Sequence, residues 1–170
     1  MKITKDAVLN AVASLMRQRF NVEAERNRQF VWGDAKILAD LYLPAPLHCI
    51  VQFDDATHCT RERAATFTNY PSDTPLNFDV RRYYADQTNG DVALAQADVL
   101  VDQLPPRHDL NPTVRIRADE IEELSGPLAE RIESILSHRF AYHAGTTFHL
   151  MVDNAGAKPH SQTMHGNLSD

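Results

Sequence analysis

Residues 4–20 repeat apolar side chains at the spacing of an amphipathic helix. Val8, Val12 and Leu15 fall on one face of that helix. Thr4 precedes it and is placed to cap the first turn, because a threonine hydroxyl accepts hydrogen bonds from the free backbone N–H groups there. The first predicted element is therefore a helix.

The next apolar segments are shorter and predict three strands, at residues 29–32, 37–43 and 48–53. Strict alternation in the second strand would put Leu38, Asp40 and Tyr42 on one face. The third strand is apolar almost throughout, and such a run is typical of a central strand that is covered on both faces.

Beyond residue 60 the pattern is mostly helical, with turn signals between the segments. The predicted helices span residues 61–70, 76–87, 91–104 and 128–136. The predicted strands span residues 113–117 and 146–152. Pro105-Pro106 is expected to close the helix at residues 91–104.

This order of elements predicts an α/β fold with a mixed central β-sheet flanked by helices. A chain of 170 residues suits a single domain. We expect this domain to span residues 1–152. Residues 153–170 are polar and lack periodicity, and we expect them to form a disordered C-terminal tail.

Composition and charge narrow the function classes. The net charge of −6 and the pI near 5.7 argue against a broadly basic surface for nucleic acid, although a local basic groove is compatible with them. No apolar run approaches the length of a membrane span, and the first 20 residues lack the apolar core of a signal peptide. Cys49 and Cys59 form no metal-binding or redox spacing, which favours reduced thiols in a cytoplasmic protein.

Acidic residues lie inside or at the end of two predicted strands. Asp40 lies inside one apolar strand, and Asp54-Asp55 follow the next one. If these strands pair through the turn at residues 44–47, Asp40 comes near Gln52 and Asp54. Clustered carboxylates repel one another unless a cation, a proton or an arginine offsets their charge, and Mg²⁺ takes oxygen ligands of this kind. The pattern therefore indicates a candidate site for Mg²⁺ or Mn²⁺.

On these residues the chain resembles the PD-(D/E)XK nuclease superfamily, and most closely its very-short-patch-repair and DUF559-type branch. Asp40 stands at the first acidic position, Gln52-Phe53-Asp54 stands at the triplet on the next strand, and His58 stands at the histidine that follows. The late strand at residues 113–117 and the closing helix at residues 128–136 are also similar to that branch.

The resemblance implies a restriction-endonuclease-like core and a Mg²⁺-dependent endonuclease that hydrolyses phosphodiester bonds in DNA. It implies catalytic roles for Asp40, Gln52, Asp54 and His58. The candidate metal ligands are Asp40, Asp54 and Asp55. The arginines that could contact phosphates are Arg61, Arg63 and Arg115.

Gln52 departs from this pattern, because the family has a glutamate there. A glutamine offers a carbonyl oxygen without a charge, which weakens the expected metal site and leaves Asp54 and Asp55 to compensate.

Each candidate also has a structural alternative. Asp40 could be held by an ion pair or hydrogen bonds at a strand end, and Asp54 and Asp55 could belong to a solvated turn. His58 could be an exposed residue before a helix, and the arginines could simply be solvated. Three aromatic residues could stack on bases or pack in the core, namely Trp32, Tyr83 and Tyr84.

Three hypotheses remain from the sequence. The first is an active Mg²⁺-dependent endonuclease. The second is a nuclease fold that has lost cleavage and acts as a binding or regulatory module, such as an accessory protein of a phage or mobile element. The third is an unrelated α/β domain. They differ in what they require of Asp40, Gln52 and Asp54, whose oxygens must converge on one ion for the first hypothesis to hold.

Overall fold

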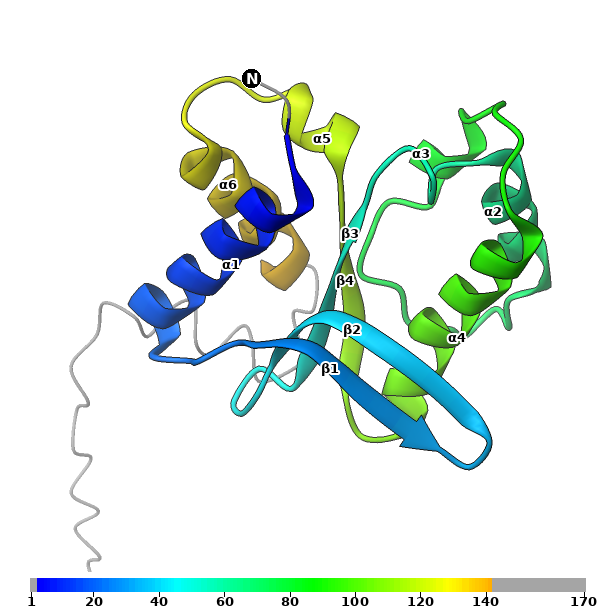
Figure 1. The fold of residues 1–170 in the computed structure, drawn as a ribbon, viewed down its shortest axis with the longest axis horizontal. Coiled ribbons are helices and arrows are strands. Elements are labelled where there is room, and N and C mark those ends of the chain that lie inside the picture. Colours follow the sequence, from blue (N-terminus) through cyan, green and yellow to red (C-terminus); the bar gives the residue numbers. More distant parts are fainter. Residues whose placement is uncertain (1–2, 142–170) are drawn as a thin grey trace, which may run out of the picture.

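The computed structural model describes residues 3–141. Its core is a four-stranded β-sheet in the order β1-β2-β3-β4, with helices on both faces (Figure 1). This confirms the predicted α/β fold with a mixed, helix-flanked sheet. The predicted strand at residues 146–152 and the predicted tail at residues 153–170 lie outside the described residues.

The first helix, α1 (Lys5–Phe20), begins and ends as its sequence indicates. Thr4 caps it, since the Thr4 hydroxyl accepts a hydrogen bond from the Ala7 N–H at 3.3 Å. Asn21 ends it in the left-handed conformation, with φ of 53°. The buried face carries four apolar residues, Val8, Leu9, Val12 and Met16.

The strands are β1 (Glu25–Trp32), β2 (Ala35–Leu43), β3 (Cys49–Asp54) and β4 (Asn111–Arg117). β1, β2 and β3 pair antiparallel in sequence order, and β4 lies parallel to β3. Every residue of β3 is buried, which confirms the predicted central strand. The sheet therefore brings β2 and β4, which are far apart in the sequence, to either side of β3.

The expected alternation along β2 is wrong beyond Ala39. Ile37, Ala39 and Tyr42 pack in one apolar cluster, whereas Leu41 packs in another. The change of side occurs at Asp40, opposite Asn27 of β1, whose backbone has φ of 52°. Asp40 thus lies at an irregular point of the strand and not on a regular face.

Two layers of helices cover the sheet (Figure 1). α1 and α6 (Leu128–Ala141) cover one face, where an apolar cluster contains residues of both helices and of β2, β3 and β4. α2 (Arg61–Thr66), the 3₁₀ turn η1 (Phe67–Asn69), α3 (Arg81–Tyr84) and α4 (Val92–Arg107) lie on the other. The short helix α5 (Ala118–Glu122) follows β4 directly.

Two helix predictions need correction. The helix predicted at residues 76–87 is wrong except at Arg81–Tyr84, because the chain at Asn77 is extended and forms a parallel bridge with Val114. The predicted stop at Pro105-Pro106 is also wrong, since α4 continues to Arg107.

The structure shows how α4 accommodates its prolines. Pro105 has no N–H to donate to the carbonyl of Val101, four residues before it. The Thr113 hydroxyl donates to that carbonyl instead, at 2.7 Å. A residue of β4 thereby completes the last turn of the helix, which no local pattern in the sequence could indicate.

None of the helices in the described part of the chain combines the length and apolar character that crossing a membrane requires.

Candidate functional site

Asp40 and Gln52 join β2 to β3 at the point where the two strands separate. The backbone ladder between these strands ends at the pair Leu41 and Val51. Beyond it, the Asp40 N–H donates to the Gln52 side-chain oxygen at 2.8 Å, and the Phe53 N–H donates to Asp40 Oδ2 at 3.0 Å. The prediction that Asp40 comes near Gln52 is confirmed, and both side chains satisfy backbone groups that the ladder leaves unpaired.

The Gln52 amide is suited to this position in a way that a carboxylate is not. Its Nε2 donates to the Leu38 carbonyl at 3.1 Å while its oxygen accepts from Asp40. These two partners fix the orientation of the amide, because one is a donor and the other an acceptor. A glutamate here would place a negatively charged oxygen against the Leu38 carbonyl.

Lys5, the first residue of α1, forms an ion pair with Asp40 Oδ1. The Asp40 side chain is 11% exposed and the Lys5 side chain is 50% exposed, so the pair lies at the border between interior and solvent. It lies on the wall of a cavity of about 330 Å³. The other polar and charged residues that line this cavity are Lys36, Gln52, Asp54, His58 and Asp98.

Asp54 belongs to the interior of the protein. Its side chain is fully buried and accepts a hydrogen bond from Arg115 at 2.8 Å and another from the Tyr83 hydroxyl. Burial raises the pKa of the Asp54 carboxyl, and the Arg115 guanidinium opposes that rise. Each Asp54 oxygen therefore already has a protein partner.

Arg115 is the centre of a buried charge network, which we call the Arg115 network (Arg115, Arg63, Asp54, Asp98 and Asp102). Besides Asp54, Arg115 donates to Asp102 at 2.7 Å and to Asp98 at 3.0 Å. Arg63 donates to the second oxygen of Asp102 at 2.5 Å. Burial acts to lower the pKa of Arg115, but the three carboxylates, Asp102 first, raise it well above its usual value.

His58 connects this network to the cavity. Its Nδ1 lies 2.9 Å from Asp98 Oδ2. The hydrogen bond to Asp98 raises the pKa of His58, and burial only partly opposes this. Burial favours the neutral acid at Asp98, but Arg115 and His58 bring the pKa of that carboxyl down to about 2. The Asp98 carboxylate, which stays ionised, therefore favours the protonated form of His58.

Two of the three arginines predicted to contact phosphates are in the interior. The side chains of Arg63 and Arg115 are at most 1% exposed, and their hydrogen bonds go to the Arg115 network and to Thr66 and Tyr70. A DNA phosphate cannot reach either guanidinium, so these two predictions are not compatible with the fold. Arg61 is exposed, as a phosphate contact requires.

Asp55 follows Asp54 directly but is not among the residues that line the cavity. It is exposed, and its Oδ1 accepts hydrogen bonds from the backbone and hydroxyl of Thr57, at 2.9 and 2.6 Å. This is the solvated turn that the sequence left open as an alternative for Asp55.

The arrangement does not fit Mg²⁺. Asp40 Oδ2 and the Gln52 oxygen accept backbone hydrogen bonds, and Lys5 holds Asp40 Oδ1. Both oxygens of Asp54 are bound within the interior. Between residues 3 and 141, no group of three or more histidine, cysteine, aspartate or glutamate side chains is placed to hold a metal ion. The motif oxygens are therefore occupied by donors of the chain itself.

The aromatic candidates divide between core and surface. Tyr83 is buried against the Arg115 network, and Trp32 stacks on His108 with ring centroids 4.6 Å apart. Tyr84 is 50% exposed. Packing is therefore the observed role of Tyr83 and Trp32.

Sequence reasoning missed four residues of the site. Lys5 and Lys36 carry no motif, and only the fold brings them to the cavity. Asp98 and Asp102 did leave a signal, because they are four residues apart on the apolar face of α4, where carboxylates are rarely found without a partner. Arg115, a charge inside an apolar strand, is the matching signal on β4.

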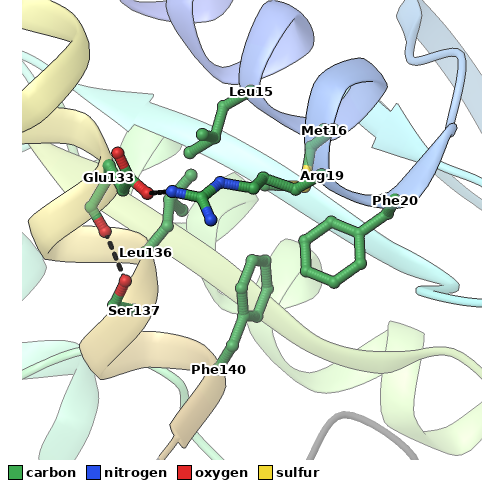
Figure 2. Close-up of a pocket in the computed structure, with 8 residues that line it drawn as sticks. All are labelled: Leu15, Met16, Arg19, Phe20, Glu133, Leu136, Ser137 and Phe140. Atoms are coloured by element: carbon green, nitrogen blue, oxygen red, sulfur yellow. Dashed lines mark hydrogen bonds and ion pairs between the residues drawn. The ribbon is translucent and has the colours of Figure 1, made fainter. Parts of the chain in front are cut away.

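Another cavity, of about 90 Å³, lies between α1 and α6 and shares no lining residue with the cavity beside Asp40. Figure 2 shows Leu15 and Leu136 facing each other across it, with Arg19 extending to form an ion pair with Glu133. The rings of Phe20 and Phe140 meet edge to face at 6.4 Å. The lining is that of a helix–helix contact, and it offers no cluster of reactive groups.

The cysteines of the candidate region are both free, as predicted, and Cys49 is buried in the core. Comparison with known proteins adds no family to this geometry, since no family model, curated protein or solved structure matches the chain.

Proposed function

We propose that this protein is a nuclease-like domain that binds a phosphate group of DNA in the cavity beside β2 and has lost metal-dependent cleavage. One observation carries the proposal: every side-chain oxygen of Asp40, Gln52 and Asp54 is already held by a donor of the chain. Such a site lacks free ligands for a cation that would activate water.

The resemblance to the nuclease family supports the first part of the proposal, that the domain is nuclease-like. Asp40 and the triplet at residues 52–54 lie on neighbouring antiparallel strands, which is the arrangement that the resemblance requires. The late strand lies beside the triplet, and the closing helix follows it.

The charges around the cavity support phosphate as the ligand. Lys5, Lys36 and His58 line the cavity, and no described carboxylate pairs with Lys36. With His58 protonated, the cavity wall and the Arg115 network behind it hold five positive charges. The four negative charges among them are Asp40, Asp54, Asp98 and Asp102. An anion would complete this balance, and the acidic remainder of the chain would confine DNA contact to this region.

Fluorescence anisotropy with labelled duplex and single-stranded DNA in EDTA tests binding. We expect binding that weakens with salt, and weaker binding by Lys36→Met, because a phosphate contact is lost. The matched control is Arg81→Met, which removes an exposed arginine paired with Asp79 outside the cavity. Equal loss in both variants would show a general charge effect, and no binding by the unaltered protein would exclude DNA.

Metal-dependent endonuclease activity is the second candidate. It is favoured by the half-exposed state of Lys5, because displacement of Lys5 would free Asp40 Oδ1. Supercoiled plasmid incubated with the protein and Mg²⁺ or Mn²⁺ separates the two candidates. Plasmid that stays supercoiled supports the binding function. Nicking that disappears in Asp40→Ala supports the nuclease.

A further inference from the structure

Lys5 stands at an unusual place for a lysine. It is the first residue of α1, whose start is fixed by the Thr4 cap. Positive charges are disfavoured at the N-terminus of a helix, because the backbone N–H groups already make that end positive. The Asp40 carboxylate offsets this, and no other carboxylate within residues 3–141 pairs with Lys5.

Lys5 balances the charge of the Asp40–Gln52 pair. Asp40 carries one negative charge, Gln52 carries none, and Lys5 carries one positive charge, so these three residues together are neutral. A second carboxylate at position 52 would leave the site with an excess negative charge. If Lys5 were also absent, Asp40 and the new carboxylate would carry two negative charges, which a divalent cation neutralises.

We propose that the Lys5 ammonium occupies the cation position of the Asp40–Gln52 site, so that the chain supplies internally the charge that a metal ion would supply. Lys5 and Gln52 act together in this arrangement. The amide at position 52 matches a monovalent partner, and its Nε2 keeps the Leu38 carbonyl from serving as a further oxygen ligand. The inference rests on the proposed function in one respect, that the site works without a bound metal.

The proposal predicts a latent metal site two substitutions away. In the variant Lys5→Met/Gln52→Glu, Asp40 Oδ1 loses its ammonium partner, a second carboxylate faces it, and the Leu38 carbonyl loses its donor. Three oxygen groups of the kind that Mn²⁺ and Mg²⁺ bind are then free at one wall of the cavity.

The matched control is Lys36→Met/Gln52→Glu. Lys36 lines the same cavity, so the control has the same net charge and the same new carboxylate, but Lys5 stays on Asp40. Mn²⁺ binding is measured by isothermal titration and by the electron paramagnetic resonance signal of free Mn²⁺. We expect Lys5→Met/Gln52→Glu to bind Mn²⁺ at least about tenfold more tightly than the control, because an opposing charge in direct contact is removed.

Two results would overturn the proposal. One is equal Mn²⁺ affinity in the two double variants, which would make the effect one of overall charge. The other is a Lys5→Met/Gln52→Glu variant that has the circular dichroism spectrum of the unaltered protein and binds no Mn²⁺. If a double variant does not fold, the single variants decide: Lys5→Met should bind Mn²⁺ about threefold more tightly than Lys36→Met, and equal affinities would reject the proposal.

This outcome is separate from the test of the proposed function. DNA binding by the unaltered protein in EDTA does not depend on how the variants bind Mn²⁺. If the variants fail to differ in Mn²⁺ binding, only the proposed role of Lys5 is rejected. If the unaltered protein does not bind DNA, only the proposed ligand is rejected.

Discussion

Two aspartates, Asp40 and Asp54, end in very different surroundings although the sequence presents them alike. Each interrupts or follows an apolar strand. Asp40 lies at the border with solvent, next to a half-exposed lysine, and accepts a backbone N–H of the next strand. Asp54 is fully buried and is bound by an arginine of β4. The partner brought by the fold, and not the local pattern, decides which acid is accessible to a ligand.

The difference shows how the fold divides polar residues between binding and stability. The Arg115 network is buried, with only Asp54 and Asp98 forming part of the cavity wall among its described members, and its removal affects the interior. The Asp40–Gln52 pair opens on a cavity, and its neighbours Lys5 and Lys36 can meet a ligand. His58 belongs to both, since it lines the cavity and binds Asp98. The following four predictions test this division, beginning with the interior.

Arg115→Met should cause the largest loss of stability. The substitution leaves three buried carboxylates without the guanidinium that they share, and breaking a buried ion pair in this way costs about 3–5 kcal/mol. Urea unfolding followed by circular dichroism measures it. The control Arg81→Met removes an exposed pair with Asp79 and should change little. If the two variants unfolded at the same urea concentration, the closed network would not be a source of stability.

Gln52→Glu should cause the next largest loss of stability, about 1–3 kcal/mol in the free energy of unfolding. The substitution leaves the Leu38 carbonyl without its donor and adds a charge beside Asp40. Unfolding in EDTA is the appropriate measurement. Gln29→Glu is the control, since Gln29 is exposed on β1 opposite Leu38 and its side chain makes no hydrogen bond among the described residues. A Gln52→Glu protein as stable as the control would mean that the amide does not hold the two strands.

His58→Gln should destabilise the protein in a pH-dependent manner. The hydrogen bond to Asp98 raises the pKa of His58 in the folded state above its unfolded value. The contribution of that bond is therefore full below the unfolded pKa of about 6.5 and is lost as the pH rises through the folded pKa. The difference in unfolding free energy between the unaltered protein and His58→Gln should be larger at pH 5.5 than at pH 9. If this difference did not change with pH, the hydrogen bond to Asp98 would not be what raises the pKa of His58.

Much of the fold could be predicted because its local signals agree. The Thr4 cap, the helical spacing of α1 and the apolar run of β3 each determine an element without help from elsewhere. The helix predicted at residues 76–87 is mostly wrong because Asn77 pairs with Val114 of β4. The stop predicted at Pro105-Pro106 is wrong because Thr113 supplies a donor from β4. Both errors have a cause in another element, the strand β4.

The candidate site, like the fold, could be predicted where it depends on neighbouring strands and not where it depends on distant partners. The proximity of Asp40 and Gln52 follows from strand pairing, which sequence patterns can indicate. The burial of Asp54 depends on Arg115 and Tyr83, which three separate elements bring together. Lys5 reaches Asp40 only after α1 has packed on the sheet. Residue types at a motif therefore predicted where a site lies, but not which of its atoms are free.

Lys5→Met should have the smallest effect on stability, about 1 kcal/mol or less, because the Lys5 side chain is half exposed and water screens its charge. The loss should shrink further in 0.5 M salt, in contrast to the loss in Arg115→Met, whose partners are shielded from ions in solution. Urea unfolding at low and high salt measures both. A large, salt-independent loss in Lys5→Met would mean that Asp40 is as much a part of the interior as Asp54. The contrast between an accessible and a closed acid would then fail, and with it the reason for placing ligand binding in the cavity that Asp40 lines.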